Sequence, residues 1–199
     1  MKLGDLLLSD LERYFHYYGQ PGRLPRRRDL WRSFFLPRCL PVTLYRLARS
    51  ARRNGWTGLA KLITWLNFYL HNLEVSSDCE IGPYLFMPHV AGTVIGAQSI
   101  GHHAVIYHQV TIGAKSIEHE HVQRPQIGDH AFIASGARVI GPITLGDHCT
   151  IGANAVVIRS FPSNVVLTGI PALSRPAHSD LLAGPDTAQV PARTDRREA

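Results

Sequence analysis

The sequence contains little cysteine and no long hydrophobic run. Its 199 residues include three cysteines, Cys39, Cys79 and Cys149, and no two of them form a CxxC pair. This scarcity excludes a secreted scaffold held together by disulfides and favours a reducing compartment. The longest uncharged, largely apolar segment, residues 62–73, has twelve residues, whereas a membrane-spanning helix needs roughly 20. We therefore do not expect the chain to cross a membrane.

We also expect no secretory leader, because residues 1–12 mix Asp5, Asp10 and Glu12 with apolar residues and offer no cleavage site. We therefore expect a cytoplasmic protein. The composition is otherwise ordinary for a globular protein, with 45% hydrophobic and 18% charged residues, which excludes wholesale disorder. At this length we expect one domain with an appendage.

Positive charge is concentrated in the first third of the chain. Residues 1–61 contain 13 basic and 4 acidic residues, while the net charge of the whole chain is +6. Arg46, Arg49 and Arg53 recur at helical spacing in a helix expected over residues 42–54. Such a face is either solvated or attracted to anionic lipid, which would give peripheral contact with the inner membrane face. No nucleic-acid recognition motif accompanies the charge, so we expect no nucleic-acid partner.

From residue 75 onward the sequence repeats with a period of six. Aliphatic residues keep this register except for a one-residue slip before Val94 and a fifteen-residue gap before Ile127, and glycine often follows them. The aliphatic positions are Val75, Ile81, Met87, Val94, Ile100, Ile106, Ile112, Ile127, Ile133, Val139, Leu145, Ile151 and Val157. This period predicts short strands joined by tight turns in a solenoid, with equivalent residues stacked in successive coils.

The pattern resembles the hexapeptide-repeat acyltransferases, which are built on a left-handed parallel β-helix. The resemblance implies an α+β, mainly β fold. We expect a basic helical region at residues 1–73, a left-handed β-helix domain at 74–176 with a loop at 114–126, and a disordered tail at 177–199. Residues 169–172, Gly-Ile-Pro-Ala, are similar to the family's closing segment. Because members of this family associate as trimers with active sites between subunits, we also expect a homotrimer.

Within these enzymes the chain is most similar to the serine acetyltransferase family. Its members pass from helices through an acidic residue to a catalytic histidine fifteen positions later, and Glu74 and His89 match those two positions. Residues 106–113, 127–129 and 151–157 match as well. The resemblance implies acetyl transfer from acetyl-CoA, with His89 as the general base and Glu74 as the carboxylate that orients its ring.

This chemistry agrees with the residue types. An alcohol must lose its proton to attack a thioester, and an imidazole with the ordinary pKa of about 6.5 can take that proton at neutral pH. A carboxylate on the other ring nitrogen fixes the tautomer. The acceptor attacks directly, so no cysteine is assigned a role, and Cys149 is expected to point inward as a small apolar residue. His108 follows His89 by about one coil and should line the same groove.

Acetyl-CoA is the only cofactor we expect. In the family its pantetheine arm lies against small residues between coils, for which Ala134, Ser135 and Ala153 are the candidates. Its phosphates require cations, and the candidates are Arg138, Arg159 and Arg175. We expect no metal cofactor, although His119 and His121 with their glutamate neighbours offer an alternative metal site in the loop.

Three departures from the serine acetyltransferase pattern concern the acceptor. Pro88 replaces an aspartate, Arg124 replaces a histidine, and residues 114–116, Ala-Lys-Ser, replace a Gly-Gly-Thr-Gly run. These features are similar to relatives that acetylate sugars in exopolysaccharide assembly, including the colanic-acid type. We therefore expect a sugar hydroxyl in glycan biosynthesis as the acceptor, contacted by His108, Arg124 and Pro88. Serine, as in cysteine biosynthesis, is the alternative, and another small alcohol also stays open.

Two other functions are left open by the sequence. His103 and His108 are five residues apart, the spacing of two zinc ligands in γ-type carbonic anhydrases, which are also hexapeptide β-helices. A trimeric scaffold without catalysis is the other alternative. The remaining repeat histidines, His102, His130 and His148, occupy turn positions where we expect solvated surface.

Overall fold

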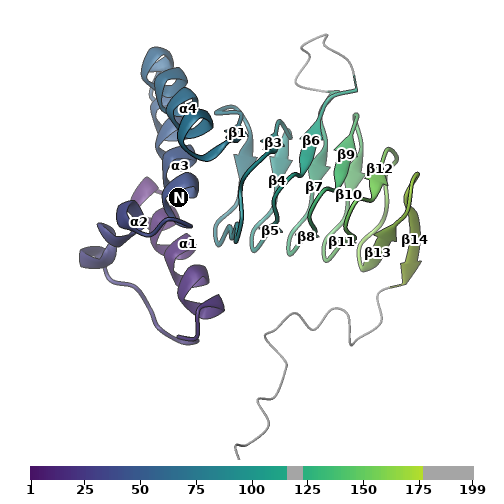
Figure 1. Cartoon of the computed structure of the whole chain (residues 1–199), viewed down its shortest axis with the longest axis horizontal. Helices are drawn as coiled ribbons and strands as arrows, with labels where there is room; N and C mark the ends of the chain where they lie inside the picture. The colour runs from purple at the N-terminus through teal and green to yellow at the C-terminus, as the bar shows by residue number, and fades with distance from the viewer. Residues whose placement is uncertain (116–122, 177–199) are drawn as a thin grey trace, which may run out of the picture.

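The computed structural model describes residues 1–115 and 123–176, and it shows helices at one end of a three-sided solenoid (Figure 1). The helices are α1 (Leu3–Tyr17), a 3-10 turn η1 (Arg27–Asp29), α2 (Arg32–Phe35), α3 (Leu40–Arg53) and α4 (Thr57–His71). α3 matches the helix expected over residues 42–54, with Pro41 in its first turn and Asn54 as its cap. The residues expected as a disordered tail, 177–199, and loop residues 116–122 lie outside the described part of the chain.

The solenoid consists of three sheets in which each strand pairs with its equivalent in the next coil. The first sheet contains β1 (Leu73–Val75), β3 (Thr93–Ile95), β6 (Thr111–Gly113), β9 (Arg138–Ile140) and β12 (Val156–Val157). The second sheet contains β2 (Glu80–Ile81), β4 (Ser99–Ile100), β7 (Gln126–Ile127) and β10 (Thr144–Leu145). The third sheet contains β5 (Val105–Ile106), β8 (Phe132–Ile133), β11 (Thr150–Ile151), β13 (Val165–Thr168) and β14 (Leu173–Pro176).

The core of the solenoid is the stack of aliphatic side chains that the six-residue period predicts. All the predicted aliphatic positions are buried except Val94, which is 40% exposed. Ile95 takes the inward place instead and pairs with Ile112 of the next coil. The prediction for Val94 was therefore wrong by one residue, because the turn before it holds an additional residue. Cys149 is fully buried, as predicted.

Glycine after the aliphatic position allows the coils to approach closely. A Cβ added to Gly82 would lie 2.7 Å from the carbonyl carbon of Gly101 in the next coil, so only hydrogen fits there. The solenoid ends after β13, where Gly169 has a φ of +93° and the chain reverses into β14. β14 pairs antiparallel with β13. This reversal agrees with the closing segment predicted at residues 169–172.

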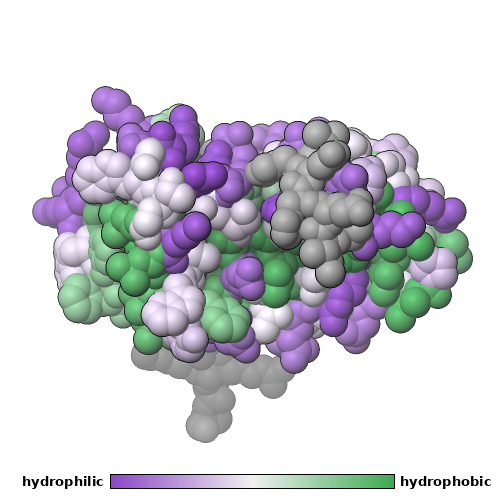
Figure 2. Space-filling view, turned by 90° about the horizontal axis from the view of Figure 1, so that it is seen from above, coloured by the Kyte–Doolittle hydropathy of each residue, from purple (hydrophilic) through white to green (hydrophobic). Residues whose placement is uncertain are grey.

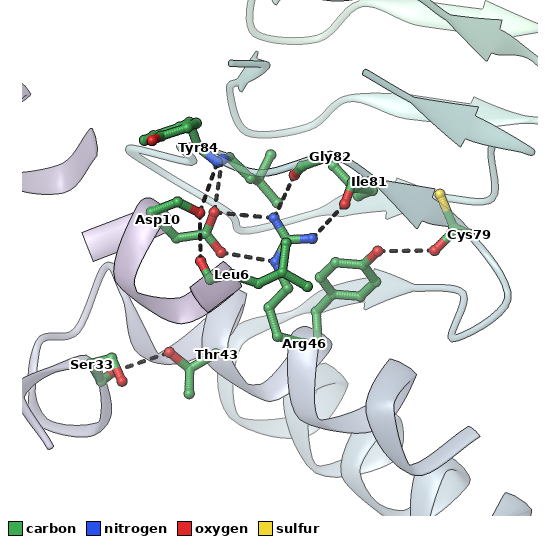
Figure 3. Close-up of polar contacts among 12 residues, drawn as sticks. Leu6, Asp10, Ser33, Thr43, Arg46, Cys79, Ile81, Gly82 and Tyr84 are labelled. Atoms are coloured by element: carbon green, nitrogen blue, oxygen red, sulfur yellow. Dashed lines mark hydrogen bonds and ion pairs between the residues drawn. The ribbon is translucent and has the colours of Figure 1, made fainter. Parts of the chain in front are cut away.

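The basic face of α3 joins the helices to the first coil of the solenoid. Arg46 is buried, forms an ion pair of 2.8 Å with Asp10 of α1, and donates hydrogen bonds to the carbonyl oxygens of Ile81 and Gly82 at 2.5 and 2.7 Å (Figure 3). β2 is the edge strand of its sheet, so these carbonyls have no strand to donate to them. Arg46 supplies the missing donors and so closes the end of the solenoid.

The alternatives of a solvated or a lipid-binding arginine stripe are therefore wrong for most of this face. Arg49, like Arg46, contacts the first coil, through an ion pair of 3.2 Å with Glu80 and a hydrogen bond to the carbonyl of Asp78. Of the three arginines Arg46, Arg49 and Arg53, only Arg53 is exposed. In residues 1–115 and 123–176, no helix combines the length and the hydropathy required to span a membrane.

Candidate active site

The predicted base lies at one corner of the solenoid, which we call the His89 corner: the turns that lead from the third sheet to the first. In successive coils this corner carries His89, His108, Ser135 and Ala153. Backbone hydrogen bonds hold the turns together, because Gly136 donates to the carbonyl of His108 and Asn154 to that of Ser135, at 3.1 and 3.0 Å. The structure therefore brings the two histidines and the small residues predicted for acetyl-CoA onto one edge of the solenoid.

The two histidines of this corner face each other across adjacent coils. The ring centroids of His89 and His108 are 5.8 Å apart and the rings lie at 86° to each other. His89 is exposed, whereas Pro88 immediately before it is buried. The buried Nδ1 of His108 has no hydrogen-bond partner in the described residues. Ile95 is eight positions after Met87, whereas the six-residue period would place the next inward-facing residue six positions after it. The two additional residues widen this turn and carry His89 outward.

Glu74 lies on β1, and its side chain points outward from the first sheet. In the described part of the chain no hydrogen bond or ion pair joins Glu74 to His89. The carboxylate instead lines a cavity of about 710 Å³ on the outer face of the first sheet. The predicted pairing of Glu74 with His89 therefore stays a prediction.

This cavity, which we call the Glu74 cavity, lies between the first sheet, α4 and the start of β7. Its apolar walls include Val94 and the α4 residues Trp65 and Phe68, and its charged residues are Glu74, Arg124 and Lys61. Arg124 donates a long hydrogen bond of 3.4 Å to the carbonyl of Gly96. Hydrophobic side chains also gather on the helical end of the face drawn in Figure 2. His89 is not among the residues that line the cavity.

The aromatic residues of α4 are part of the site that sequence reasoning missed. From the sequence, residues 62–73 are interpreted only as a segment too short to span a membrane. The sequence carried one usable signal, because residues 57–71 are apolar around most of a helical circumference. In the structure only Ala60 and Asn67 of this helix are buried. A helix that buries so little of its apolar surface has a face available for other contacts.

The cations predicted for the phosphates of acetyl-CoA do not form one cluster. Arg138 lies beside the His89 corner and donates to the carbonyls of Gln109 and Gly136, at 2.8 and 2.6 Å. Arg159 follows β12 at a different corner and lies over the ring of Phe161. Arg175 belongs to β14 in the third sheet. Of the three, only Arg138 is next to Ala134 and Ser135.

Within one chain, His103 and His108 do not form a shared zinc site. β5 separates them, so His103 lies in the turn before the third sheet and His108 in the turn after it. Their spacing of five residues therefore places them at two different corners. His103 stacks instead on Tyr84 and His130.

Comparison with known proteins identifies the family. The bacterial transferase hexapeptide (six repeats) model matches residues 124–159. A serine acetyltransferase of Helicobacter pylori is 32% identical over 147 residues, which cover 73% of this chain and 85% of that protein. The chain belongs to the serine acetyltransferase family. A Mycobacterium tuberculosis serine acetyltransferase is 34% identical, over 69% of this chain and 60% of that protein. A Staphylococcus xylosus serine acetyltransferase is 40% identical, over 57% and 52%.

Solved structures of the serine acetyltransferase family show the same fold. The enzyme from Neisseria gonorrhoeae is 21% identical and has a TM-score of 0.74, covering 88% of this chain and 66% of that chain. A serine acetyltransferase in complex with CoA is 20% identical with a TM-score of 0.72, covering 86% and 68%. The present chain thus spans about two thirds of the length of these solved relatives.

These comparisons decide several predictions. The left-handed β-helix preceded by helices is confirmed, as are an acyltransferase of the serine acetyltransferase family and acetyl-CoA as its acetyl donor. The specific likeness to exopolysaccharide O-acetyltransferases is not supported, because the relatives named above are all serine acetyltransferases.

Proposed function

We propose that this protein transfers the acetyl group of acetyl-CoA to the hydroxyl of serine. The observation that supports serine as the acceptor is that charges of both signs line the Glu74 cavity: the carboxylate of Glu74 and the cations of Arg124 and Lys61. Free serine presents an ammonium, which matches the carboxylate, and a carboxylate, which matches a cation. The serine acetyltransferase names of the curated relatives support the same acceptor, so serine replaces the sugar that the sequence favoured.

His89 is the general base of the proposed reaction. A neutral ring nitrogen of His89 takes the proton from the serine hydroxyl as its oxygen attacks the thioester carbonyl. The tetrahedral intermediate then collapses, the carbon–sulfur bond breaks, and the imidazolium returns the proton to the leaving thiolate. The buried, unpartnered Nδ1 of His108 lies in the next coil and is available to hydrogen-bond a reacting group. Glu74 would orient His89 or bind the serine ammonium, and these two roles can be distinguished by experiment.

We propose that the active site is completed between subunits of a homotrimer. In one chain His89 is outside the Glu74 cavity, so the base and the acceptor pocket occupy separate surfaces. A second copy of the chain that places its His89 corner against this cavity would join the two halves. Closed cyclic assemblies repeat such an interface at every subunit, which is the arrangement that the hexapeptide resemblance implies.

A sugar hydroxyl is the second candidate acceptor, and one feature of the cavity favours it. Trp65 and Phe68 offer flat apolar faces in a space of about 710 Å³, against which a pyranose ring can pack. Buried Pro88 also leaves no carboxylate directly before the base.

The test is release of CoA thiol from acetyl-CoA with serine and with free and nucleotide-linked sugars at matched concentrations. We expect the highest kcat/KM with serine, near-complete loss in His89→Asn, and retained activity in His148→Asn, a turn histidine on another corner. A higher kcat/KM with a sugar would overturn serine as the acceptor. If none of these acceptors accelerates thiol release by the folded protein, the proposed function is wrong.

A further inference from the structure

A column of stacked rings runs along a second corner of the solenoid, formed by the turns that lead from the second sheet to the third. His103 stacks on Tyr84 with centroids 4.3 Å apart, His130 stacks on His103 at 4.7 Å, and His148 stacks on His130 at 4.5 Å. Each of these four residues occupies the left-handed region, with φ between 55° and 62°. The shared turn conformation therefore repeats the same ring position in every coil.

One further histidine converts this column into a cluster of nitrogen donors. The ring of His102 crosses those of His103 and His130 at 81° and 83°, with both centroid distances at 4.9 Å. The Nδ1 atoms of His102 and His103 are 2.8 Å apart. One ring nitrogen from each of His102, His103 and His130 lies within 4.8 Å of the other two. Three imidazoles from two adjacent coils therefore lie together at the surface.

Asp129 holds His102 in the orientation that a metal ligand requires. Its Oδ2 is 2.8 Å from the Nε2 of His102, and its Oδ1 accepts the backbone N–H of the same residue at 2.9 Å. A proton on Nε2 that points to the carboxylate makes Nδ1 of His102 the acceptor of the 2.8 Å hydrogen bond with Nδ1 of His103, and a metal ion would replace that shared proton. Histidine ligands of metals commonly donate their other N–H to a carboxylate in this way.

We propose that His102, His103 and His130 bind one late first-row divalent cation, with Zn²⁺ as the reference ion, and that Asp129 supports the site as a hydrogen-bond acceptor for His102. Imidazole nitrogens suit Zn²⁺, Ni²⁺ and Cu²⁺, and three of them leave a fourth position for water. Zinc–nitrogen bonds of about 2.0–2.1 Å place the nitrogens about 3.3 Å apart, so the stacked rings of His103 and His130 must tilt toward each other on binding.

The bound ion would connect two coils of the solenoid and would not take part in acetyl transfer. His102 and His103 precede β5, whereas His130 precedes β8 in the next coil. The cluster lies at a different corner from His89, so the site is independent of the proposed function. An ion that binds only the folded solenoid raises its melting temperature, and the rise continues as the concentration of free ion exceeds the Kd.

The test is titration of the full chain with Zn²⁺ alone by isothermal calorimetry, beside thermal unfolding with and without the ion. The starting protein carries His119→Asn and His121→Asn, which removes the loop histidines that could bind zinc by themselves. We expect one ion per chain and a higher melting temperature, with His130→Asn and His102→Asn each weakening the affinity more than 10-fold. Asp129→Asn should weaken it about 10- to 100-fold.

The matched control is His148→Asn, which changes the same column at the same turn position but removes no ligand. Asparagine tolerates the left-handed conformation, so the turn should keep its shape. Affinity within about 2-fold of the starting protein is expected. Absence of Zn²⁺ binding by the starting protein would overturn the proposal, and so would equal affinity in the folded His130→Asn variant. Retained acetyl transfer in each variant shows that a loss of zinc affinity is not a loss of fold.

Discussion

His89 and His108 face each other edge to face across adjacent coils, with ring centroids 5.8 Å apart, although nineteen residues separate them in the sequence. The relationship follows from the length of one coil plus the widening of the turn that carries His89. It places a partly buried imidazole, whose Nδ1 lacks a partner in the described residues, directly beside an exposed one. Two titratable rings therefore meet where the acyl group and the acceptor are proposed to react.

Replacement of His89 by asparagine should remove the base while leaving the turn intact. Because general base catalysis contributes about 10²- to 10⁴-fold, kcat should fall by that factor. Steady-state thiol release measures this loss, and circular dichroism with thermal unfolding confirms the fold. A kcat within a few-fold of wild type would show that another group takes the proton.

Glu74 has two roles to be distinguished, and the kinetic constants separate them. If its carboxylate orients His89, Glu74→Gln should lower kcat by about 10²- to 10⁴-fold, change the pH profile of kcat and leave the KM for serine nearly unchanged. If it binds the serine ammonium from the cavity, the KM for serine should rise while kcat stays within a few-fold. We expect the second result, because the carboxylate lines the cavity and makes no hydrogen bond to His89 within the described residues, with Glu74→Asp restoring part of the affinity for serine.

The proposed sharing of the site between subunits can be tested by mixing two inactive chains. His89→Asn lacks the base, and Arg124→Ala lacks the guanidinium of the cavity. When the two are unfolded and refolded together in equal amounts, about a quarter of the interfaces in random trimers receive both intact halves. Activity should therefore recover to roughly a quarter of that of the wild type. If each chain carries its complete site, the mixture should stay inactive.

The solenoid was predictable because one short rule repeats along the chain. Each aliphatic residue must stack on its equivalent, so the register predicts the strands, the buried residues and the groove shared by His89 and His108. Val94 does not follow this rule, because the widened turn at His89 shifts the inward-facing position by one residue, to Ile95. The slip before Val94 indicated this insertion, but the period could not show that it is one residue longer than the slip.

The contacts between the helices and the solenoid were not predictable from spacing. The helical recurrence of Arg46 and Arg49 was real, but it could not show that the first coil leaves carbonyl oxygens without donors at its edge strand. Nor could the sequence bring His102 and His103 beside His130, because the loop at residues 114–126 interrupts the period between them. His148 follows His130 by eighteen residues, which is one uninterrupted coil, so the sequence could predict that these two histidines stack.

The buried pair between Asp10 and Arg46 should be essential for the stability of the helical end. Burial raises the pKa of Asp10, while the adjacent guanidinium and the N–H of Leu85 favour its charged form. Arg46→Met leaves that carboxylate without its cation and leaves the carbonyls of Ile81 and Gly82 without donors. Since breaking a buried ion pair costs about 3–5 kcal/mol, the free energy of unfolding should fall by that amount.

Urea denaturation measures this change, and Arg52→Ala provides the matched control. Arg52 pairs with Asp78 at 2.8 Å, but both side chains are about 40% exposed, so its loss should cost only about 0–1 kcal/mol. The double variant Asp10→Asn/Arg46→Met removes both charges. It should recover only part of the loss, because the two carbonyl oxygens at the edge of β2 still lack donors. Full recovery would mean that the ion pair, and not the closure of the first coil, is what Arg46 contributes.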